Sequence, residues 1–487
     1  MRMLFSVLIL AIGATSGAAA TDSTKAAAVP PGGPNAITRF LENEPPEPSD
    51  ESARIQVHPV EVRREYKLTI GSWSTRFSLP EDFDILELGD RLRGFLGMFL
   101  ILGVAVFLSD DRTAISRRVV FWGLSLQWIF AFLVLRWSTG AWLLKEVGTG
   151  VERALGCAME GAEFVFGPAM VDRNGPVGFV FAFHVLPTVI FVAALFAVLY
   201  HLGGMQWIVR VFALVMARLM GTSGAESVNV AASLFLGQTE APLTVRPYLA
   251  RMTNSELLTV MTAGMAHVSG GIMAAYFAFG IEPRHILASV VMTAPGSILL
   301  SKLLVPETGT PETLRATGLH DERPDANVLD AASRGTRDGL HLALNIAAML
   351  IAFLGLIALV NLGLSWFGTS LQAIFGWAMA PVAYMMGVAW EDCRPVGGLL
   401  GTRVVLNELI AFGELSELRE VILDRSFVIA SFALCGFANI GSIGIQLGGL
   451  GALAPERRHD LARLGVRALL AGTLANFLTA CIAGVLL

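Results

Sequence analysis

Residues 237–248 read GQTEAPLTVRPY and interrupt an apolar stretch with three adjacent polar side chains, Gln238, Thr239 and Glu240. Gly237 and Pro242 flank these side chains, and both residue types discourage a continuous helix. Amide and ionisable side chains are costly inside a membrane, so they usually face a polar site there. The stretch therefore predicts a broken, re-entrant segment whose helix ends and freed backbone groups point at a cavity. The alternative is a loop outside the membrane whose polar side chains are solvated.

The composition of the whole chain indicates that most of it lies in lipid. Hydrophobic residues make up 54% of the 487 residues and charged residues only 15%, whereas a soluble chain carries about a quarter charged residues. Apolar runs, most of them long enough to cross roughly 30 Å of hydrocarbon as helices, recur at 94–108, 119–135, 177–200, 256–280, 285–301, 340–365, 426–448 and 466–487. We therefore expect an all-α polytopic membrane protein. The net charge of −5 gives no sign of a nucleic-acid partner, and we expect none.

The N-terminus has the pattern of an export signal. A basic residue precedes the apolar run 4–12, and small residues lead to Ala18-Ala19-Ala20, which suits cleavage. We expect residues 1–20 to be a signal peptide, with an uncleaved membrane anchor as the alternative. Residues 21–88 are polar, and the loose alternation within 55–79 predicts a few short strands in an extracytoplasmic region.

Lys and Arg in short loops predict the orientation of the chain, because these residues favour the cytoplasmic side. In the inner membrane of a bacterial-type cell, the broken segment 226–249 then opens from the inside and 390–412 from the outside. Each is followed by a span, so the two units form an inverted repeat, a layout that exposes one central site alternately to either side. We expect scaffold and interfacial helices in 89–225, and a transport core with both hairpins in 226–487 that includes the scaffold helix 340–365.

Three other places put polar side chains inside apolar segments. Glu408 suits a bound cation, a proton or the hydroxyls of a ligand, unless it forms a structural ion pair with Arg403. Asn439 and Ser442 lie among glycines and share a face if that span is helical, and close helix packing is the alternative reason for the glycines. His267 is either a proton carrier or a histidine that is simply hydrogen-bonded.

Four of these segments, in this order, resemble the signatures of the concentrative nucleoside transporter family. They are 237–248 (GQTEAPLTVRPY), 404–412 (VVLNELIAF), 435–446 (CGFANIGSIGIQ) and 448–457 (GGLGALAPER). The resemblance is close over about 177–487, looser over 90–176, and does not include 1–88. Four linked motifs in one order are far more specific than any one of them.

The resemblance implies about eight transmembrane helices plus two re-entrant hairpins, usually in a homotrimer. It also implies import of nucleosides on a sodium or proton gradient, with no other cofactor. By motif, Gln238, Thr239 and Glu240 would address the nucleobase, Glu408, Asn439 and Ser442 would hold the ribose hydroxyls, and Phe437 would line the pocket. A carboxylate accepts from hydroxyls, while amide and hydroxyl groups both donate and accept. Uridine-like pyrimidines are the expected substrates, with purines such as adenosine as further candidates.

The residues expected to hold the coupling ion depart from the family pattern. Sodium-coupled members carry Asn where this chain has Ser233, and Ser or Thr where it has His267. The carbonyls of Leu236, His267 and Val268 could still bind Na⁺, which takes oxygen ligands of any origin. We hypothesise proton coupling, with His267 or a carboxylate of the site as carrier, because an oxygen ligand is lost and a titratable ring is gained.

Two other classes of protein are alternatives. An intramembrane enzyme could use buried Glu, His and Ser side chains, but the sequence contains no HExxH, GxSxG or paired-aspartate metal motif. A passive nucleoside channel would share the polar residues but not the inverted, hairpin-bearing arrangement, and it could not accumulate substrate. We therefore expect a secondary active transporter and no enzyme.

Overall fold

The computed structural model describes residues 64–70, 73–79, 85–172, 180–314 and 325–487. The chain falls into two units, Met1–Gly89 and Asp90–Leu487, and each is described by itself. The predicted signal peptide, residues 1–20, and most of the predicted extracytoplasmic region lie outside the described residues.

The first unit contains an antiparallel hairpin of two strands, β1 (Arg64–Ile70) and β2 (Trp73–Leu79). The strands pair from Arg64 opposite Leu79 to Ile70 opposite Trp73. Both strands lie in the alternating stretch for which the sequence predicts short strands. That prediction is confirmed, while the location of this region outside the cytoplasm stays a prediction.

The described part of the second unit is helical throughout. The elements that precede the first hairpin are α2 (Ile85–Phe107), which begins in the first unit, η1 (Arg112–Ala114), α3 (Arg117–Ala131), the π-helical turn η2 (Phe132–Arg136), α4 (Ser138–Phe166), α5 (Pro168–Val171), α6 (Phe181–His184), α7 (Leu186–His201) and α8 (Gly204–Met220). Two further helices, α14 (Val328–Ser365) and α15 (Leu371–Met385), separate the two halves that carry the site.

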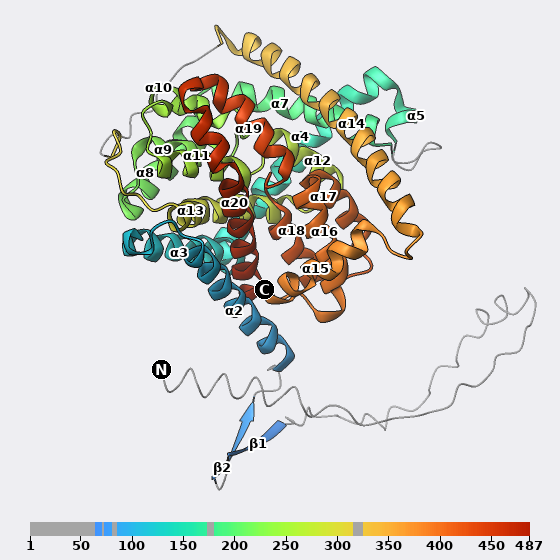
Figure 1. Cartoon of the computed structure of the whole chain (residues 1–487). Helices are drawn as coiled ribbons and strands as arrows, with labels where there is room; N and C mark the ends of the chain where they lie inside the picture. Colours follow the sequence, from blue (N-terminus) through green and yellow to red (C-terminus); the bar gives the residue numbers. More distant parts are fainter. Residues whose placement is uncertain (1–63, 71–72, 80–84, 173–179, 315–324) are drawn as a thin grey trace, which may run out of the picture. The chain divides into compact units, whose positions relative to one another are not determined.

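Those two halves repeat one order of elements: a broken hairpin, a broken helix and a long helix. The first half contains α9 (Gly224–Ala232), η3 (Ala241–Val245), α10 (Arg246–Leu249), α11 (Asn254–Ala266), α12 (Gly270–Ala278) and α13 (Pro283–Leu304). The second half contains η4 (Trp390–Asp392), α16 (Cys393–Val405), α17 (Glu408–Glu417), α18 (Asp424–Leu434), α19 (Ile440–Leu453), η5 (Pro455–Arg457) and α20 (Arg458–Leu486). α20, the last helix of the second half, packs against α11 and α13 of the first half and against α18 of its own half (Figure 1).

Six helical stretches in the described residues, some of them made of consecutive elements, are long and apolar enough to cross a membrane: Arg117–Arg136, Phe181–His201, Asn254–Ala278, Pro283–Leu304, Val328–Ser365 and Pro455–Leu486. α2 and the broken pair α18–α19 coincide with two further apolar runs of the sequence. The all-helical membrane fold of this unit is therefore as predicted, whereas the number of eight transmembrane helices stays a prediction.

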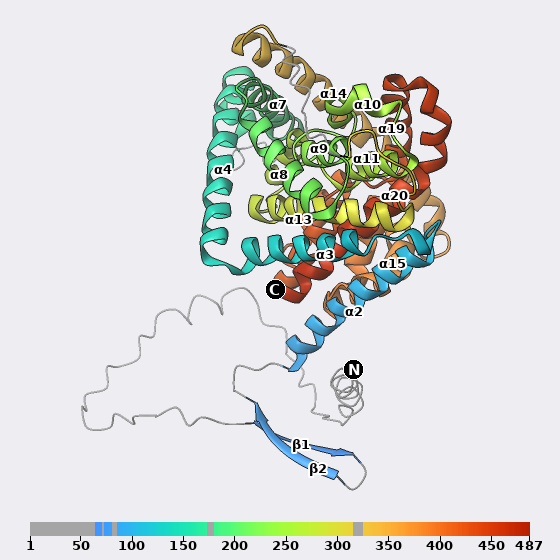
Figure 2. The ribbon, with the colours of Figure 1, turned by 90° about the vertical axis from the view of Figure 1, so that its left-hand side faces the viewer.

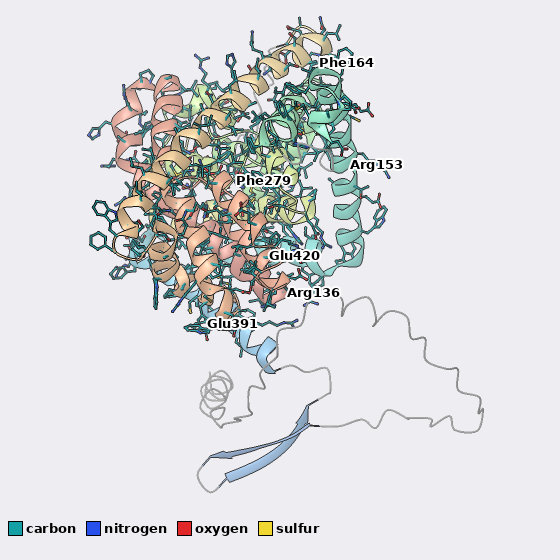
Figure 3. The ribbon with its side chains drawn as sticks, turned by 90° about the vertical axis from the view of Figure 1, so that its right-hand side faces the viewer. Arg136, Arg153, Phe164, Phe279, Glu391 and Glu420 are labelled. Atoms are coloured by element: carbon teal, nitrogen blue, oxygen red, sulfur yellow. The ribbon has the colours of Figure 1, made fainter. Side chains whose placement is uncertain are left out.

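α4 is oriented differently from its neighbours in sequence. It runs across the direction of α3 and α13, which lie side by side (Figure 2). Arg153 and Phe164 lie along its outer edge, and the side chain of Phe164 is 92% exposed (Figure 3). An apolar side chain on such a crosswise helix suits the boundary between headgroups and acyl chains better than water. The presence of interfacial helices in 89–225 stays a prediction.

The apolar run 256–280, which the sequence predicts as one span, is divided in the structure. α11 ends at Ala266 and α12 begins at Gly270. The Ser269 hydroxyl accepts a hydrogen bond from the Ile272 N–H and caps the new helix. Such a cap satisfies one of the unpaired N–H groups at a helix start and so favours a fresh start over continuation. One predicted span is therefore two half-helices that meet at His267.

Candidate functional site

The polar residues singled out in the sequence lie at the tips of the hairpins and at the two helix breaks. Gln238, Thr239 and Glu240 follow α9, Glu408 begins α17, Phe437 and Asn439 lie between α18 and α19, and Ser442 lies in the first turn of α19. The side chains of Gln238, Glu408, Asn439 and Ser442 are buried, those of Thr239 and Phe437 are half-buried, and that of Glu240 is exposed.

Glu408 is the carboxylate at the centre of this group. Asn407 caps α17 by accepting a hydrogen bond from the Ile410 N–H at 2.9 Å, which places Glu408 at the N-terminal end of the helix. That end favours negative charge. The amide of Asn439 donates to Glu408 Oε2 at 3.2 Å, and Tyr276 Oη lies 3.4 Å from Oε1, which is long for a hydrogen bond. Both oxygens of the carboxylate therefore face donors.

Asn439 is held by both ends of its amide. Its oxygen accepts from the Ser442 N–H at 2.9 Å and caps α19, while its nitrogen bonds Glu408. The sequence predicts that Asn439 and Ser442 share a helical face, but Asn439 precedes the helix and reaches Ser442 through its cap. The reason is the strong preference of Asn for the N-cap position.

Ser442 links this group to the first hairpin. Gln238 Nε2 lies 3.2 Å from Ser442 Oγ. A continuous series of contacts therefore runs from Gln238 through Ser442, Asn439 and Glu408 to Tyr276. It joins the first hairpin, α19, α17 and α12, so both halves of the repeat contribute to one site.

Glu240 and Thr239 stand apart from this series. Glu240 Oε2 accepts a hydrogen bond from the Gly237 N–H at 2.9 Å, which closes the turn that the sequence places here. The Thr239 side chain packs against Gly449 of α19, where an added Cβ would lie 2.7 Å from Thr239 Cγ2. The predicted roles of both residues toward a ligand stay predictions.

His267 and Ser233, two of the residues predicted to hold the coupling ion, lie together. His267 Nδ1 is 2.9 Å from the Ala263 carbonyl and 3.3 Å from Ser233 Oγ. A carbonyl can only accept, so Nδ1 carries the hydrogen in the neutral ring. The Ser233 hydroxyl donates to the Val230 carbonyl at 2.8 Å, and His267 Nε2 is buried without a hydrogen-bond partner among the described residues. The ring therefore keeps one free basic nitrogen.

The other two predicted ion ligands belong to the same region. Leu236 is half-buried, and the carbonyl of its neighbour Phe235 accepts a hydrogen bond from the Gly270 N–H at 2.9 Å. Val268 is buried beside the His267 carbonyl, which accepts from the Phe437 N–H at 3.3 Å. The described residues contain no cluster of three or more His, Cys, Asp or Glu side chains that could hold a metal. At the four predicted residues themselves, a bound Na⁺ would depend on backbone carbonyls and the Ser233 hydroxyl.

Arg403 is fully buried on the second hairpin and binds neutral groups. Its guanidinium donates to the Ala433 carbonyl at 3.0 Å, to the Gly436 carbonyl at 3.3 Å and to the Asn476 amide oxygen. Between Arg403 and Glu408, both of which the structure describes, no ion pair forms. The alternative interpretation of Glu408 as an ion-pair partner is therefore not observed.

Asn476, Tyr276 and Gln446 belong to this region but were not singled out in the sequence. The Asn476 amide donates to the carbonyls of Ala266 and Cys435, both at 2.8 Å, and so joins the two helix breaks. Asn476 and Gln446 were visible as amide residues in apolar runs, the same signal that identified Asn439. Tyr276 gave no such signal, because its partner lies more than a hundred residues away in sequence.

Three family profiles match most of the chain. "Na+ dependent nucleoside transporter N-terminus" matches residues 96–169, "Nucleoside recognition" matches 182–282, and "Na+ dependent nucleoside transporter C-terminus" matches 285–484. All the residues of the candidate site lie within the second and third matches.

Curated relatives and solved structures agree with these profiles. Mouse "Solute carrier family 28 member 3" is 41% identical over 427 residues, which cover 83% of this chain and 60% of that protein. The "Uncharacterized transporter YutK" of Bacillus subtilis is 42% identical over 403 residues, covering 81% and 98%. The chain thus spans about 60% of the mouse relative and almost all of the bacterial one.

The structure of CNTnw "in an inward-facing substrate-bound state" is 40% identical, with a TM-score of 0.78, and the match covers 81% of this chain and 97% of that one. A CNTnw variant in an outward-facing state also matches with a TM-score of 0.78. With these identities over four-fifths of its length, the chain belongs to the Na⁺-dependent, concentrative nucleoside transporter family.

Proposed function

We propose that this chain is a secondary active transporter that imports nucleosides by cation symport. One observation carries the proposal: the series of contacts from Gln238 to Tyr276, which joins both halves of the repeat at one buried polar site. The family is one of nucleoside transporters and not of enzymes, and the apolar helices identify the chain as an integral membrane protein. A rat relative is named "Sodium/nucleoside cotransporter 1".

The side chains of the site are suited to bind a ligand that has a sugar with hydroxyl groups and a base with polar edges. Glu408 can accept from two ribose hydroxyls, which would replace its contacts with Asn439 and Tyr276. Asn439 and Ser442 both donate and accept, so they can complete the ribose contacts. Gln238 would meet the base, together with its neighbours Thr239 and Glu240, and the half-buried ring of Phe437 would line the pocket. Uridine-like pyrimidines are the substrate class we propose first, with purine nucleosides second.

For the coupling ion we propose a site at Ser233, Leu236, His267 and Val268, with His267 as a proton carrier. The free Nε2 supports a proton, because it is the one basic nitrogen of the ring without a partner. The family name supports Na⁺, which would have to use the carbonyls of the break and the Ser233 hydroxyl. Uptake driven by a pH gradient without Na⁺ distinguishes the two ions.

The purified protein in proteoliposomes tests the proposal. An imposed inward gradient of protons or Na⁺ should drive accumulation of labelled uridine above its external concentration, and a panel of nucleosides should compete. Equilibration without accumulation would instead indicate a passive channel. No nucleoside uptake under either gradient would refute the proposed function.

Replacement of Glu408 by Gln keeps the size of the side chain and removes its charge. Because a neutral amide is a weaker acceptor for two ribose hydroxyls, Glu408→Gln should lose uptake while yield and assembly persist. Uptake at the wild-type rate in this variant would remove Glu408 from the site. The matched control is Glu417→Gln, which changes an exposed carboxylate at the other end of the same helix, α17, outside the proposed site, and should leave uptake unchanged.

The remaining parts of the proposal concern assembly and location. We propose a homotrimer in the inner membrane, with residues 21–88 outside the cytoplasm after removal of the signal peptide 1–20. We also propose that 226–487 is the transport core, around scaffold helices in 89–225 and the scaffold helix 340–365. Cross-linking in native membranes and labelling of a cysteine placed within 64–79 would test these two points.

A further inference from the structure

Gln446 is a second buried glutamine beside the candidate site, and the sequence motifs assign it no role. It lies on α19 one helical turn beyond Ser442, hence on the same face, and it is fully buried. Its Nε2 donates to the Met261 carbonyl at 2.9 Å. A carbonyl can only accept, so this contact fixes which end of the amide is nitrogen. The other end, Oε1, is buried and has no hydrogen-bond partner in the part of the chain that the structure describes.

Gly264 of α11 shows that Gln446 and Gln238 share one small space. A Cβ at Gly264 would lie 2.7 Å from Gln446 Nε2 and 3.0 Å from Gln238 Cβ. The shorter contact would force the Gln446 amide to move and the longer one would displace Gln238 slightly, so glycine allows both glutamines to lie close to α11. The amide of Gln446 is therefore a neighbour of the residue that the first motif places at the nucleobase.

Gln238 differs from Gln446 in the freedom of its amide. Its only hydrogen-bond partner in the described residues is the Ser442 hydroxyl at 3.2 Å. A hydroxyl can donate or accept, so the Gln238 amide can turn over and keep this contact. The end that remains free is then either an acceptor or a donor. Gln238 can adapt to the ligand, whereas the contact with Met261 fixes the orientation of the Gln446 amide and leaves Oε1 as an unpaired acceptor.

We propose that Gln446 is a specificity-determining residue that reads an N–H donor on the nucleobase, such as the ring imide of uridine. A buried acceptor without a partner is unfavourable, and a base that presents an N–H group to Oε1 removes that penalty. A base that lacks the donor leaves the oxygen unpaired, and sites built to hydrogen-bond a polar group reject such analogues. This inference rests on the proposed function, because it assumes that a nucleoside occupies the site.

Uridine and 3-methyluridine form the probe pair, since the methyl group replaces the imide hydrogen. Wild-type protein should bind uridine at least about tenfold more tightly than 3-methyluridine, measured by calorimetry on the purified protein. Gln446→Met has a similar size but no acceptor, so it should weaken uridine binding and leave 3-methyluridine binding nearly unchanged. The ratio of the two affinities should then fall toward one.

Gln127 provides the matched control. It is a fully buried glutamine on α3 whose Nε2 contacts Thr479 Oγ1 at 3.3 Å and whose Oε1 has no hydrogen-bond partner within the described ranges. Gln127→Met removes a similar amide outside the site and should leave the affinity ratio unchanged. If Gln446→Met does not fold, Gln446→Asn withdraws the oxygen by one methylene group and should lower the ratio in the same direction.

An unchanged ratio in the folded Gln446 variants, or no discrimination by the wild type, would overturn the role of Gln446. Either result can occur while uridine is bound and transported, so it leaves the proposed function intact. Failure of the wild type to bind any nucleoside is a different outcome and would reject the proposed function itself.

Discussion

Lys302 offers the sharpest test of what holds the first hairpin in place. Its ammonium lies 2.8 Å from Glu226 Oε2 at the base of that hairpin, 3.1 Å from Glu307 Oε2 and 3.0 Å from Ser255 Oγ. The side chain of Lys302 is 6% exposed and that of Glu226 is 1% exposed. One cation therefore pairs with two carboxylates, one of which is almost completely buried by the protein. We choose Lys302→Met, which keeps most of the chain length and removes the charge.

The surroundings of Lys302 determine how much Lys302→Met should lower the free energy of unfolding. Removal of one partner from a buried ion pair costs about 3–5 kcal/mol, because the other charge stays buried without compensation. Glu307 is 23% exposed and also accepts hydrogen bonds from Thr253 and Gly309, so its carboxylate stays solvated and hydrogen-bonded when the Lys302 ammonium is removed. A cavity of about 290 Å³ beside the cluster can admit water to Glu226. We therefore expect a loss near the lower end, about 3 kcal/mol in the free energy of unfolding.

Equilibrium unfolding in mixed micelles measures this loss, and two variants make the result interpretable. Glu226→Gln in the Lys302→Met background removes the stranded charge and should recover most of the lost stability. Arg251→Met is the surface control, because Arg251 and Glu312 are 62% and 45% exposed, and it should cost at most about 1 kcal/mol. Equal losses for Lys302→Met and Arg251→Met, or no recovery in the double variant, would refute the reasoning.

Three further predictions concern the site. Gly264→Ala should weaken uridine binding about tenfold, because the new Cβ meets Gln446 and Gln238. Gly448→Ala on α19, where no atom lies within 4 Å of the added Cβ, should not, and equal affinities in calorimetry would contradict the packing argument. Asn476→Ala should lower the free energy of unfolding by about 3 kcal/mol, since it leaves Arg403 and two carbonyls short of partners. A loss below about 1 kcal/mol in micelle unfolding would show that water replaces the amide. His267→Gln should abolish uptake driven by a pH gradient in proteoliposomes while uridine still binds, and persistence of that uptake would exclude His267 as the carrier.

The sequence predicted where two of the three helix breaks at the site lie, but it did not predict the contacts that their residues make. Gly237 and Pro242 marked the first break, and the glycines around Asn439 marked another, because these residues disfavour a continuous helix on their own. The break at His267 was missed because Ser269 and two glycines lie in an otherwise uniform apolar run. The break is caused by the Ser269 cap at the start of α12. The cap can end the helix there only because Asn476 of a neighbouring helix donates a hydrogen bond to the Ala266 carbonyl, which the break leaves unpaired.

Partners far apart in sequence were beyond prediction from the residues. Arg403 next to Glu408 in an apolar run suggested an ion pair, since two opposite charges five residues apart are the simplest local solution. In the structure the guanidinium of Arg403 instead donates hydrogen bonds to carbonyls at the C-terminal end of α18 and to the amide oxygen of Asn476. The carbonyls at a helix end carry partial negative charge, so they can hold a cation and leave the carboxylate free for a ligand.

The location of the site follows from the repeat itself. A broken helix leaves backbone groups unpaired, and in lipid these groups must find partners within the protein. Two of these contacts cross between the halves: Asn476 of α20 donates to the Ala266 carbonyl, and the Phe437 N–H donates to the His267 carbonyl. Asn476 also donates to the Cys435 carbonyl of its own half and so links the two breaks. The two breaks therefore have to meet, and the polar side chains next to them are brought together by the same requirement. The hydrogen bonds that pair the backbone groups of the two breaks therefore also bring the neighbouring side chains of Ser442, Asn439 and Glu408 together. The proposed ligand site is formed where the two broken helices meet.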